Sequence, residues 1–222
     1  MKLIDLTHPY TLNHFRSIYE LHPRHTHEKN VAMSQLIYIN GHSHTHVDAP
    51  LHYLPDGDSM EKVSLEKFYG EASIVNLAHV NQNEPITIEA LEEKGKHIRP
   101  GDIILLRTDW PLKCDYKSRD FWLEAPYLKR DSLKWLVEQR PKMIGIDFPP
   151  EYSSRLRITD PTFKPTREDM PFHDTLFPPG IMVVEYLCNL HLLHKERTLF
   201  MALPIPFEGG DGSPTRAVAL EI

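Results

Sequence analysis

Short apolar runs alternate along this chain with charged and turn-forming segments. Runs of this kind, bounded by turn residues, are typical of buried or half-buried strands. They predict strands at residues 2–6, 34–39, 72–77, 102–108, 143–147, 181–186 and 198–203. Apolar residues at helical spacing predict helices at residues 87–96 and 130–139.

Helix caps, turn-forming residues and the absence of a linker refine this outline. Asp131 and Ser132 are candidate caps for the second predicted helix, and Pro141 predicts its end. Residues 152–174 are rich in charge and turn formers, which predicts a long, partly ordered excursion near the functional site. No repeat and no low-complexity linker divides the chain. The sequence therefore predicts one α/β domain over residues 1–222, with a mixed sheet and few helices.

Composition narrows the classes of partner. With 222 residues, of which 41% are hydrophobic and 25% charged, the chain resembles an ordinary globular protein with one sizeable core. Its apolar runs are too short to span a bilayer, and a net charge of -6 argues against a nucleic-acid partner. The chain opens on a strand-like segment without a leader pattern, which predicts a cytoplasmic location. Cys114 and Cys188 are expected to be plain thiols.

Histidine is the residue type that departs from an ordinary composition. Nine of the 14 histidines lie within the first 52 residues, and several fall in the segment "GHSHTHVDAPLHY" at residues 41–53. If residues 40–48 form an extended strand, alternate side chains share one face. That face would carry His42, His44, His46 and Asp48. Pro50 predicts a bend that returns His52 to the same pocket.

This segment is a candidate metal site, because imidazole and carboxylate groups are the usual ligands of zinc and similar divalent ions. The alternatives are a solvated edge strand with chance histidines or a tag-like tract. A second pair of ligands is His173, in a predicted loop, and Glu185, in an apolar run where an ionised carboxylate requires a counter-charge. For Glu185 the alternative is a salt bridge to Arg107 or Arg216.

The first motif also resembles a known family signature, H-x-G-T-H-x-D-x-P-x-H. The residues in register are His42, Thr45, His46, Asp48, Pro50 and His52, and a later pair twelve residues apart matches His173 and Glu185. Segments such as "IDLTHPY", "GDIILLRTDW" and "ALPIPFEGGDGSPTRAVAL" follow in family order. The chain resembles the cyclase-like metal-dependent hydrolases, which include bacterial kynurenine formamidase and isatin hydrolase.

The resemblance implies a compact α/β fold with a partly opened barrel, assembled as a homodimer or homotetramer. It implies one or two divalent ions, zinc or manganese, with a small-molecule substrate. The implied ligands are His42, His46, Asp48, His173 and Glu185, and Asp48 and Glu185 are able to bridge two ions. His52 is the implied acid/base residue.

Two departures from the family pattern bear on the substrate. His44 replaces the family glycine, where a side chain on the ligand face would be an extra ligand, a donor to a ligand or a plug. The segment 10–30 lacks the Trp-Pro-Gly-Asp pattern of formamidases. It carries His14, His22, His25 and His27, which are surface or oligomer-contact residues or substrate contacts.

Hydrolysis of an amide or lactam is the reaction that such a site favours, because a divalent ion lowers the pKa of bound water to roughly 7. A lactone hydrolase and a dehydrating cyclase are alternatives on the same site. A metal-binding module with closed coordination, in which His44 fills the open position, is an alternative of another class. No G-x-S-x-G nucleophile motif is present. Candidate aromatic residues for the pocket are Phe15, Tyr19, Tyr53, Phe68 and Phe172.

Overall fold

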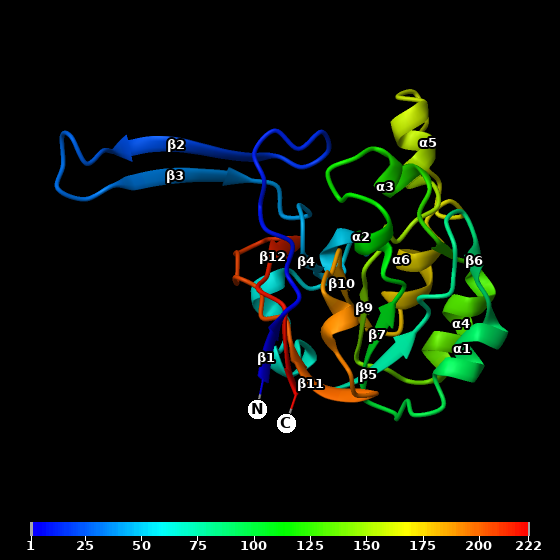
Figure 1. The fold of residues 1–222 in the computed structure, drawn as a ribbon. Coiled ribbons are helices and arrows are strands. Elements are labelled where there is room, and N and C mark those ends of the chain that lie inside the picture. Colours follow the sequence, from blue (N-terminus) through cyan, green and yellow to red (C-terminus); the bar gives the residue numbers. More distant parts are fainter. Residues whose placement is uncertain (1, 222) are drawn as a thin grey trace.

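A curled, mixed sheet forms the centre of the computed structural model, which describes residues 2–221 (Figure 1). In this part of the chain the sheet has nine strands, in the order β1-β13-β11-β5-β7-β9-β10-β4-β12. Neighbouring strands from β5 to β10 are parallel, and the flanking pairs are antiparallel. The strands are β1 (Lys2–Asp5), β4 (His46–Asp48), β5 (Tyr69–Asn76), β7 (Ile103–Arg107), β9 (Met143–Ile146), β10 (Met182–Glu185), β11 (Arg197–Met201), β12 (Gly212–Pro214) and β13 (Val218–Glu221).

The central strands are apolar throughout because both faces of the sheet are covered. On β7, Ile104 and Leu106 belong to one core cluster, and Ile103 and Leu105 belong to a second. The second cluster combines residues of β7 with residues of β1, β4, β11 and β13, so the sheet curls toward that face. This half-barrel within a single α/β domain confirms the predicted fold class.

Helices cover the other face, and Figure 1 shows them gathered on one side of the sheet. They are α1 (Ile88–Lys94), α4 (Arg130–Glu138) and α6 (Pro171–Leu176). Thr87 caps α1, since its side chain accepts a hydrogen bond from the Ala90 amide at 3.3 Å. The predicted caps of α4 are wrong: Lys129 holds the cap position, and the Ser132 hydroxyl donates to the carbonyl of Ile86.

Short elements connect these layers. They are the paired strands β6 (Pro85–Ile86) and β8 (Tyr127–Leu128), the helices α2 (Trp110–Lys113), α3 (Asp120–Leu123) and α5 (Ser154–Thr159), and the 3-10 turns η1 (Pro50–His52), η2 (Met60–Lys62), η3 (Leu65–Lys67) and η4 (Leu190–Leu192). The segment 152–174 therefore contains α5 and the start of α6. His173 lies in α6, and the expectation that it lies in a loop is wrong.

A long hairpin projects from the body of the molecule (Figure 1). It pairs β2 (Tyr19–His25) with β3 (Ser34–Ile39) in an antiparallel two-stranded sheet. The strand predicted at residues 34–39 is confirmed, but its burial is not. Leu36, Ile37 and Tyr38 are 59%, 64% and 59% exposed because no second layer covers either face of the hairpin.

The extended strand expected over residues 40–48 is also wrong. Residues 41–45 form turns and bends, and regular pairing begins only at His46. His44 lies in the left-handed region with φ of 55°, which interrupts the alternation of faces that a regular strand would give. No helix in residues 2–221 is long and apolar enough to cross a membrane.

Candidate metal centre

Strand pairing places two acidic residues beside a histidine at one end of the sheet. In the antiparallel ladder of β4 and β10, Glu185 lies opposite His46. His46 Nε2 lies 3.1 Å from Asp48 Oδ1 and 3.8 Å from Glu185 Oε2. All three side chains are buried. Period-two geometry puts His46 and Asp48 on the same face of β4, toward Glu185.

Two further histidines reach this group from other elements. His173 on α6 directs Nε2 to within 3.5 Å of Asp48 Oδ2 and 3.4 Å of Glu185 Oε1. His42, in the turn before β4, places Nδ1 2.7 Å from Asp48 Oδ1. The structure thus brings together the five residues that the family resemblance implies as metal ligands, and Asp48 lies at their centre.

Outer hydrogen bonds fix the orientation of the imidazole rings. His46 donates from Nδ1 to its neighbour His44's carbonyl oxygen at 2.8 Å, and His173 donates from Nδ1 to Glu151 Oε1 at 2.7 Å. Each ring is left with Nε2 facing the carboxylates, which is the arrangement typical of histidines that bind metals. Glu151 was missed by the sequence reasoning. The sequence feature that could have indicated it is the position of an acidic residue directly after Pro149 and Pro150, at the end of an apolar segment.

Asp211 is a second residue that the sequence reasoning missed. Its Oδ2 lies 3.0 Å from His42 Nε2 and 3.4 Å from His52 Nδ1, so it joins two of the predicted site residues. It directly precedes Gly212, the first residue of β12, and Gly212 lies against the His42 ring. A Cβ atom on Gly212 would lie 2.5 Å from His42 Cε1. The absence of a side chain there is therefore required for the position of His42.

The donor set fits a divalent cation. Among the described residues, Asp48 Oδ2 and Glu185 Oε1 are buried and accept no hydrogen bond, although His173 Nε2 lies 3.5 and 3.4 Å from them. Buried carboxylate oxygens without a hydrogen bond are costly unless a cation neutralises them. Two groups have donor atoms within 4.8 Å of one another: His46 with Asp48 and Glu185, and His42 with Asp48 and His52. Nitrogen and carboxylate oxygen donors suit zinc and related divalent ions. Asp48 belongs to both groups.

The electrostatics of the site also call for positive charge. Burial raises the pKa of Asp48, but the His46, His173 and His42 imidazoles outweigh burial and leave that pKa well below its ordinary value. Burial lowers the pKa of His42, but Asp48 and Asp211 raise it to about 9. For His173, burial is outweighed by Asp48, Glu151 and Glu185, which raise its pKa well above the ordinary value. A field that retains protons on these imidazoles also favours a bound cation.

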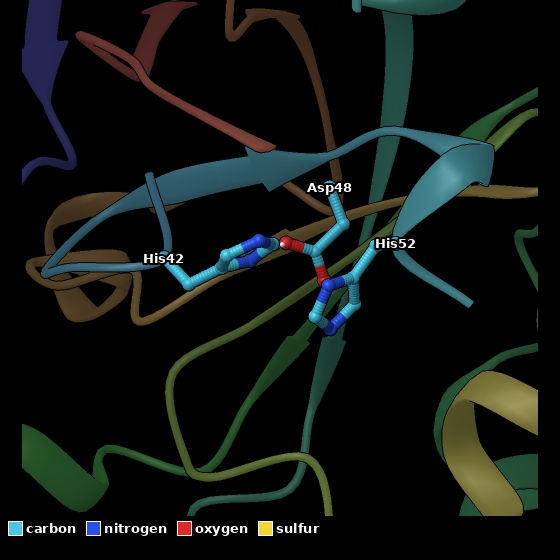
Figure 2. Close-up of side chains that lie close together, drawn as sticks. All are labelled: His42, Asp48 and His52. Atoms are coloured by element: carbon cyan, nitrogen blue, oxygen red, sulfur yellow. Dashed lines mark hydrogen bonds and ion pairs between the residues drawn. The ribbon is translucent and has the colours of Figure 1, made fainter. Parts of the chain in front are cut away.

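His52 lies beside this group, in the turn η1. Ala49 remains extended with ψ of 156°, and Pro50 then starts the turn. The His52 ring centroid lies 4.0 Å from that of His42 and 5.3 Å from that of His173. Figure 2 shows His42, Asp48 and His52 directed toward one another. Burial lowers the pKa of His52, so its imidazole is neutral near pH 7.

His44 points away from the candidate metal ligands and does not line the pocket above them, so it is neither a ligand nor a plug. It is fully buried, stacks on Tyr10 with centroids 4.4 Å apart, and accepts a hydrogen bond at Nε2 from the Thr11 amide at 3.2 Å. Its positive φ gives a physical reason for the family glycine at this position, because glycine adopts that conformation without strain. The alternative of a metal-binding module with closed coordination required His44 to fill the open coordination position. His44 does not fill it.

The structure contradicts two further expectations, the alternative salt bridge of Glu185 and the aromatic lining of the pocket. Arg107 pairs with Asp109 and Arg216 with Asp5, so the alternative salt bridge to Glu185 is wrong. The pocket over the candidate ligands has a volume of about 200 Å³. None of the five candidate aromatic residues lines it. The lining residues are Arg16, Asn40, His42, His46, Asp48, His52, Pro150, Glu151, Ser153, Ser154, Arg157, Met170, His173, Glu185 and Tyr186.

A curled α/β half-barrel with a buried histidine and carboxylate centre defines the class of protein. The family model described as "Putative cyclase" matches residues 4–150. The chain belongs to this cyclase family.

Individual relatives are more distant. The kynurenine formamidase of Bacillus mycoides (strain KBAB4) is 28% identical over 177 residues, which cover 80% of this chain and 75% of the relative. Isatin hydrolase A from Ralstonia solanacearum has a similar fold, with a TM-score of 0.79 and 22% identity over 98% of this chain and 91% of its own. A structure described as a predicted metal-dependent hydrolase from Bacillus stearothermophilus has a TM-score of 0.72 and 22% identity over 98% and 97% of the two chains.

Proposed function

We propose that this protein is a metal-dependent hydrolase that cleaves the carbon–nitrogen bond of an N-formyl amine or a cyclic amide. The observation that carries the proposal is the pair of orphaned carboxylate oxygens on Asp48 and Glu185, surrounded by imidazoles beneath a small pocket. The names of the relatives, kynurenine formamidase and isatin hydrolase, support an amide substrate.

The ligands proposed for one or two ions of zinc or manganese are His42, His46, Asp48, His173 and Glu185. Asp48 lies in both candidate groups and is the proposed bridging ligand. A divalent ion, when bound, supplies Lewis acidity that acidifies water and polarises a carbonyl group. The outer partners, His44's carbonyl and the Glu151 carboxylate, hold the imidazole rings in the ligating orientation.

His52 is the proposed acid/base residue. Its imidazole is neutral near pH 7 because burial lowers its pKa, so a nitrogen lone pair is able to accept a proton from attacking water. The protonated ring then donates that proton to the leaving nitrogen. Asp211 Oδ2, 3.4 Å from His52 Nδ1, orients the ring and stabilises its protonated form. Thr45 is not a nucleophile, because its hydroxyl donates to the carbonyl of Tyr186 at 2.6 Å.

The test is turnover by metal-loaded protein on a panel of N-formyl arylamines, isatin-like lactams and lactones. We expect amide cleavage, and a loss of roughly 100- to 10,000-fold in kcat for His52→Ala with its metal content retained. His79→Ala, a change at an exposed histidine, is the matched control. Loss of metal in His52→Ala would assign His52 as a ligand instead. Absence of turnover on the whole panel would refute the hydrolase.

We also propose that the protein assembles as a homodimer, or as a homotetramer built from dimers, through the hairpin of β2 and β3. An isolated two-stranded hairpin is at best marginally stable in water. This one exposes Leu36 and Ile37 on opposite faces, together with Val31 and Met33 near its tip. A second copy carries the same apolar hairpin and provides a self-complementary partner.

A further inference from the structure

We propose that the substrate carries a carboxylate group in addition to its scissile amide, and that Arg16 and Arg157 bind this group at the mouth of the pocket. The inference rests on the proposed function, because it assigns the class of substrate to the same site. Both arginines line the pocket over the metal ligands, although they are far apart in sequence. Arg16 precedes β2, and Arg157 lies on α5.

Neither guanidinium group is paired within residues 2–221. Arg107, Arg130, Arg167, Arg197 and Arg216 each have an acidic partner. Arg16 and Arg157 have no such ion pair among the described residues, although both belong to a pocket that contains three carboxylates. Two positive charges therefore remain at the mouth of the pocket.

The carboxylates of the pocket are already engaged below the mouth. Glu151 binds His173 at 2.7 Å, and Asp48 is surrounded by three imidazoles. Glu185 lies 3.4 Å from His173 and belongs to the candidate ligand set. A divalent ion would balance the charge of Asp48 and Glu185, so these groups are not available to neutralise the arginines. An anion from the substrate is the complementary partner.

The structure anchors the helix that carries Arg157 and places an aromatic ring beside Arg16. On α5, Arg155 donates to the side chain of Asn83 and to the carbonyl of Ala125, and its guanidinium lies 4.4 Å from the Tyr152 ring centroid. These contacts anchor the helix that carries Arg157. Arg16 lies with its guanidinium carbon 5.9 Å from the Trp122 ring centroid.

Guanidinium groups are well suited to this role because they match a planar carboxylate with two parallel N–H donors. The remaining wall includes Met170, Pro150 and Tyr186, which provide apolar surface for the body of a small substrate. Together these features favour a small amide with an apolar body and a carboxylate at the end remote from the metal ligands.

The experiment compares kcat/KM of metal-loaded protein for 2- and 3-formamidobenzoate with that for uncharged formanilide. We expect the ratio of charged to uncharged substrate to fall about tenfold in Arg16→Gln and in Arg157→Gln, as for loss of a charged hydrogen bond. The fall is expected to be larger in the double variant. Arg24→Gln, an exposed arginine on β2 outside the pocket, is the matched control and is expected to keep the wild-type ratio.

An unchanged ratio in the double variant would overturn the carboxylate site and leave the hydrolase intact. If neither formanilide nor the formamidobenzoates are cleaved, N-formyl amines are excluded as substrates and the kinetic comparison cannot be made. Calorimetric titration of the metal-loaded protein with benzoate then decides the inference. Weaker binding by the double variant than by wild type and Arg24→Gln would support the site, whereas equal or absent binding in all three would overturn it.

Discussion

Glu185 on β10 and His46 on β4 occupy opposite positions in one antiparallel ladder, with Oε2 and Nε2 3.8 Å apart. Strand pairing therefore fixes the distance between a buried carboxylate and a buried imidazole that are far apart in sequence. Such a carboxylate is expensive to bury without a counter-charge. The register of two strands thus positions two of the five candidate ligands before any ion is bound.

Replacement of Glu185 by glutamine tests this relationship. The amide keeps the shape of the side chain but removes its negative charge, so bound metal should fall. We expect metal affinity to decrease by more than the 10- to 100-fold that is typical for loss of an outer partner. Elemental analysis and competition with a chromophoric chelator measure it. Wild-type affinity in a folded Glu185→Gln protein, as judged by circular dichroism, would exclude Glu185 as a ligand.

Glu151 should have a smaller effect than Glu185, because it acts through His173. In Glu151→Gln the amide still accepts the hydrogen bond from His173 Nδ1 but no longer supplies charge. We expect metal affinity to fall roughly 10- to 100-fold, with Glu168→Gln, at an exposed residue between α5 and α6, as the control. Equal affinities in Glu151→Gln and Glu168→Gln would show that the carboxylate of Glu151 does not tune the site.

Much of the sheet could be predicted from the sequence because its central strands are buried on both faces and read as apolar runs. Residues 103–107 are an example. The projecting hairpin was predicted in part: β3 has the same apolar signal, yet Leu36 and Ile37 are exposed. Sequence pattern reports the tendency to form a strand, whereas burial depends on whether another layer covers it.

The candidate site could be predicted in its ligand types but not in its local geometry. The density of histidines and the family signature indicated the five candidate ligands, whereas strand alternation wrongly put His44 beside them. The positive φ of His44 breaks that alternation, and a positive φ is uncommon for any residue other than glycine. Glu151 and Asp211 lie in loops whose positions depend on tertiary contacts, so their approach to His173 and His42 has no periodic signal.

Gly212 makes a steric prediction about His42. In Gly212→Ala the new Cβ atom would lie 2.5 Å from His42 Cε1, so the ring must move. We expect weaker metal binding and a loss of about 1–3 kcal/mol in the free energy of unfolding, as for an overpacked site. Chemical denaturation of metal-free protein measures the stability. In a His42→Ala background the ring is absent, so Gly212→Ala should lower the free energy of unfolding much less than it does in the wild-type protein. Equal losses in the two backgrounds would refute the clash.

The hairpin predicts the assembly state. We expect wild-type protein to sediment as a dimer or tetramer, and the double variant Leu36→Glu with Ile37→Glu to sediment as a monomer, because charge on both faces of β3 opposes apolar pairing. Analytical ultracentrifugation measures this over a range of concentrations. Lys29→Glu, at the exposed turn of the same hairpin, controls for added negative charge. A monomeric wild type would contradict the proposed interface.

Metal affinity should rise with pH because protons and the cation compete for the same imidazoles. His42 has a pKa raised to about 9 by Asp48 and Asp211 against the opposing effect of burial. It is therefore protonated at pH 7 in the metal-free protein. Each displaced proton makes the apparent affinity rise about tenfold per pH unit below that pKa. The rise contributed by His42 should level off above pH 9.

Competition titrations from pH 6 to pH 9 measure this slope, and calorimetry in two buffers of different ionisation enthalpy counts the protons released. His42→Ala should bind metal more weakly and with a shallower pH dependence, because one competing proton has been removed. His173 has a raised pKa as well, so part of the slope should persist in that variant. An affinity independent of pH in the wild-type protein would show that these imidazoles do not ligate the ion.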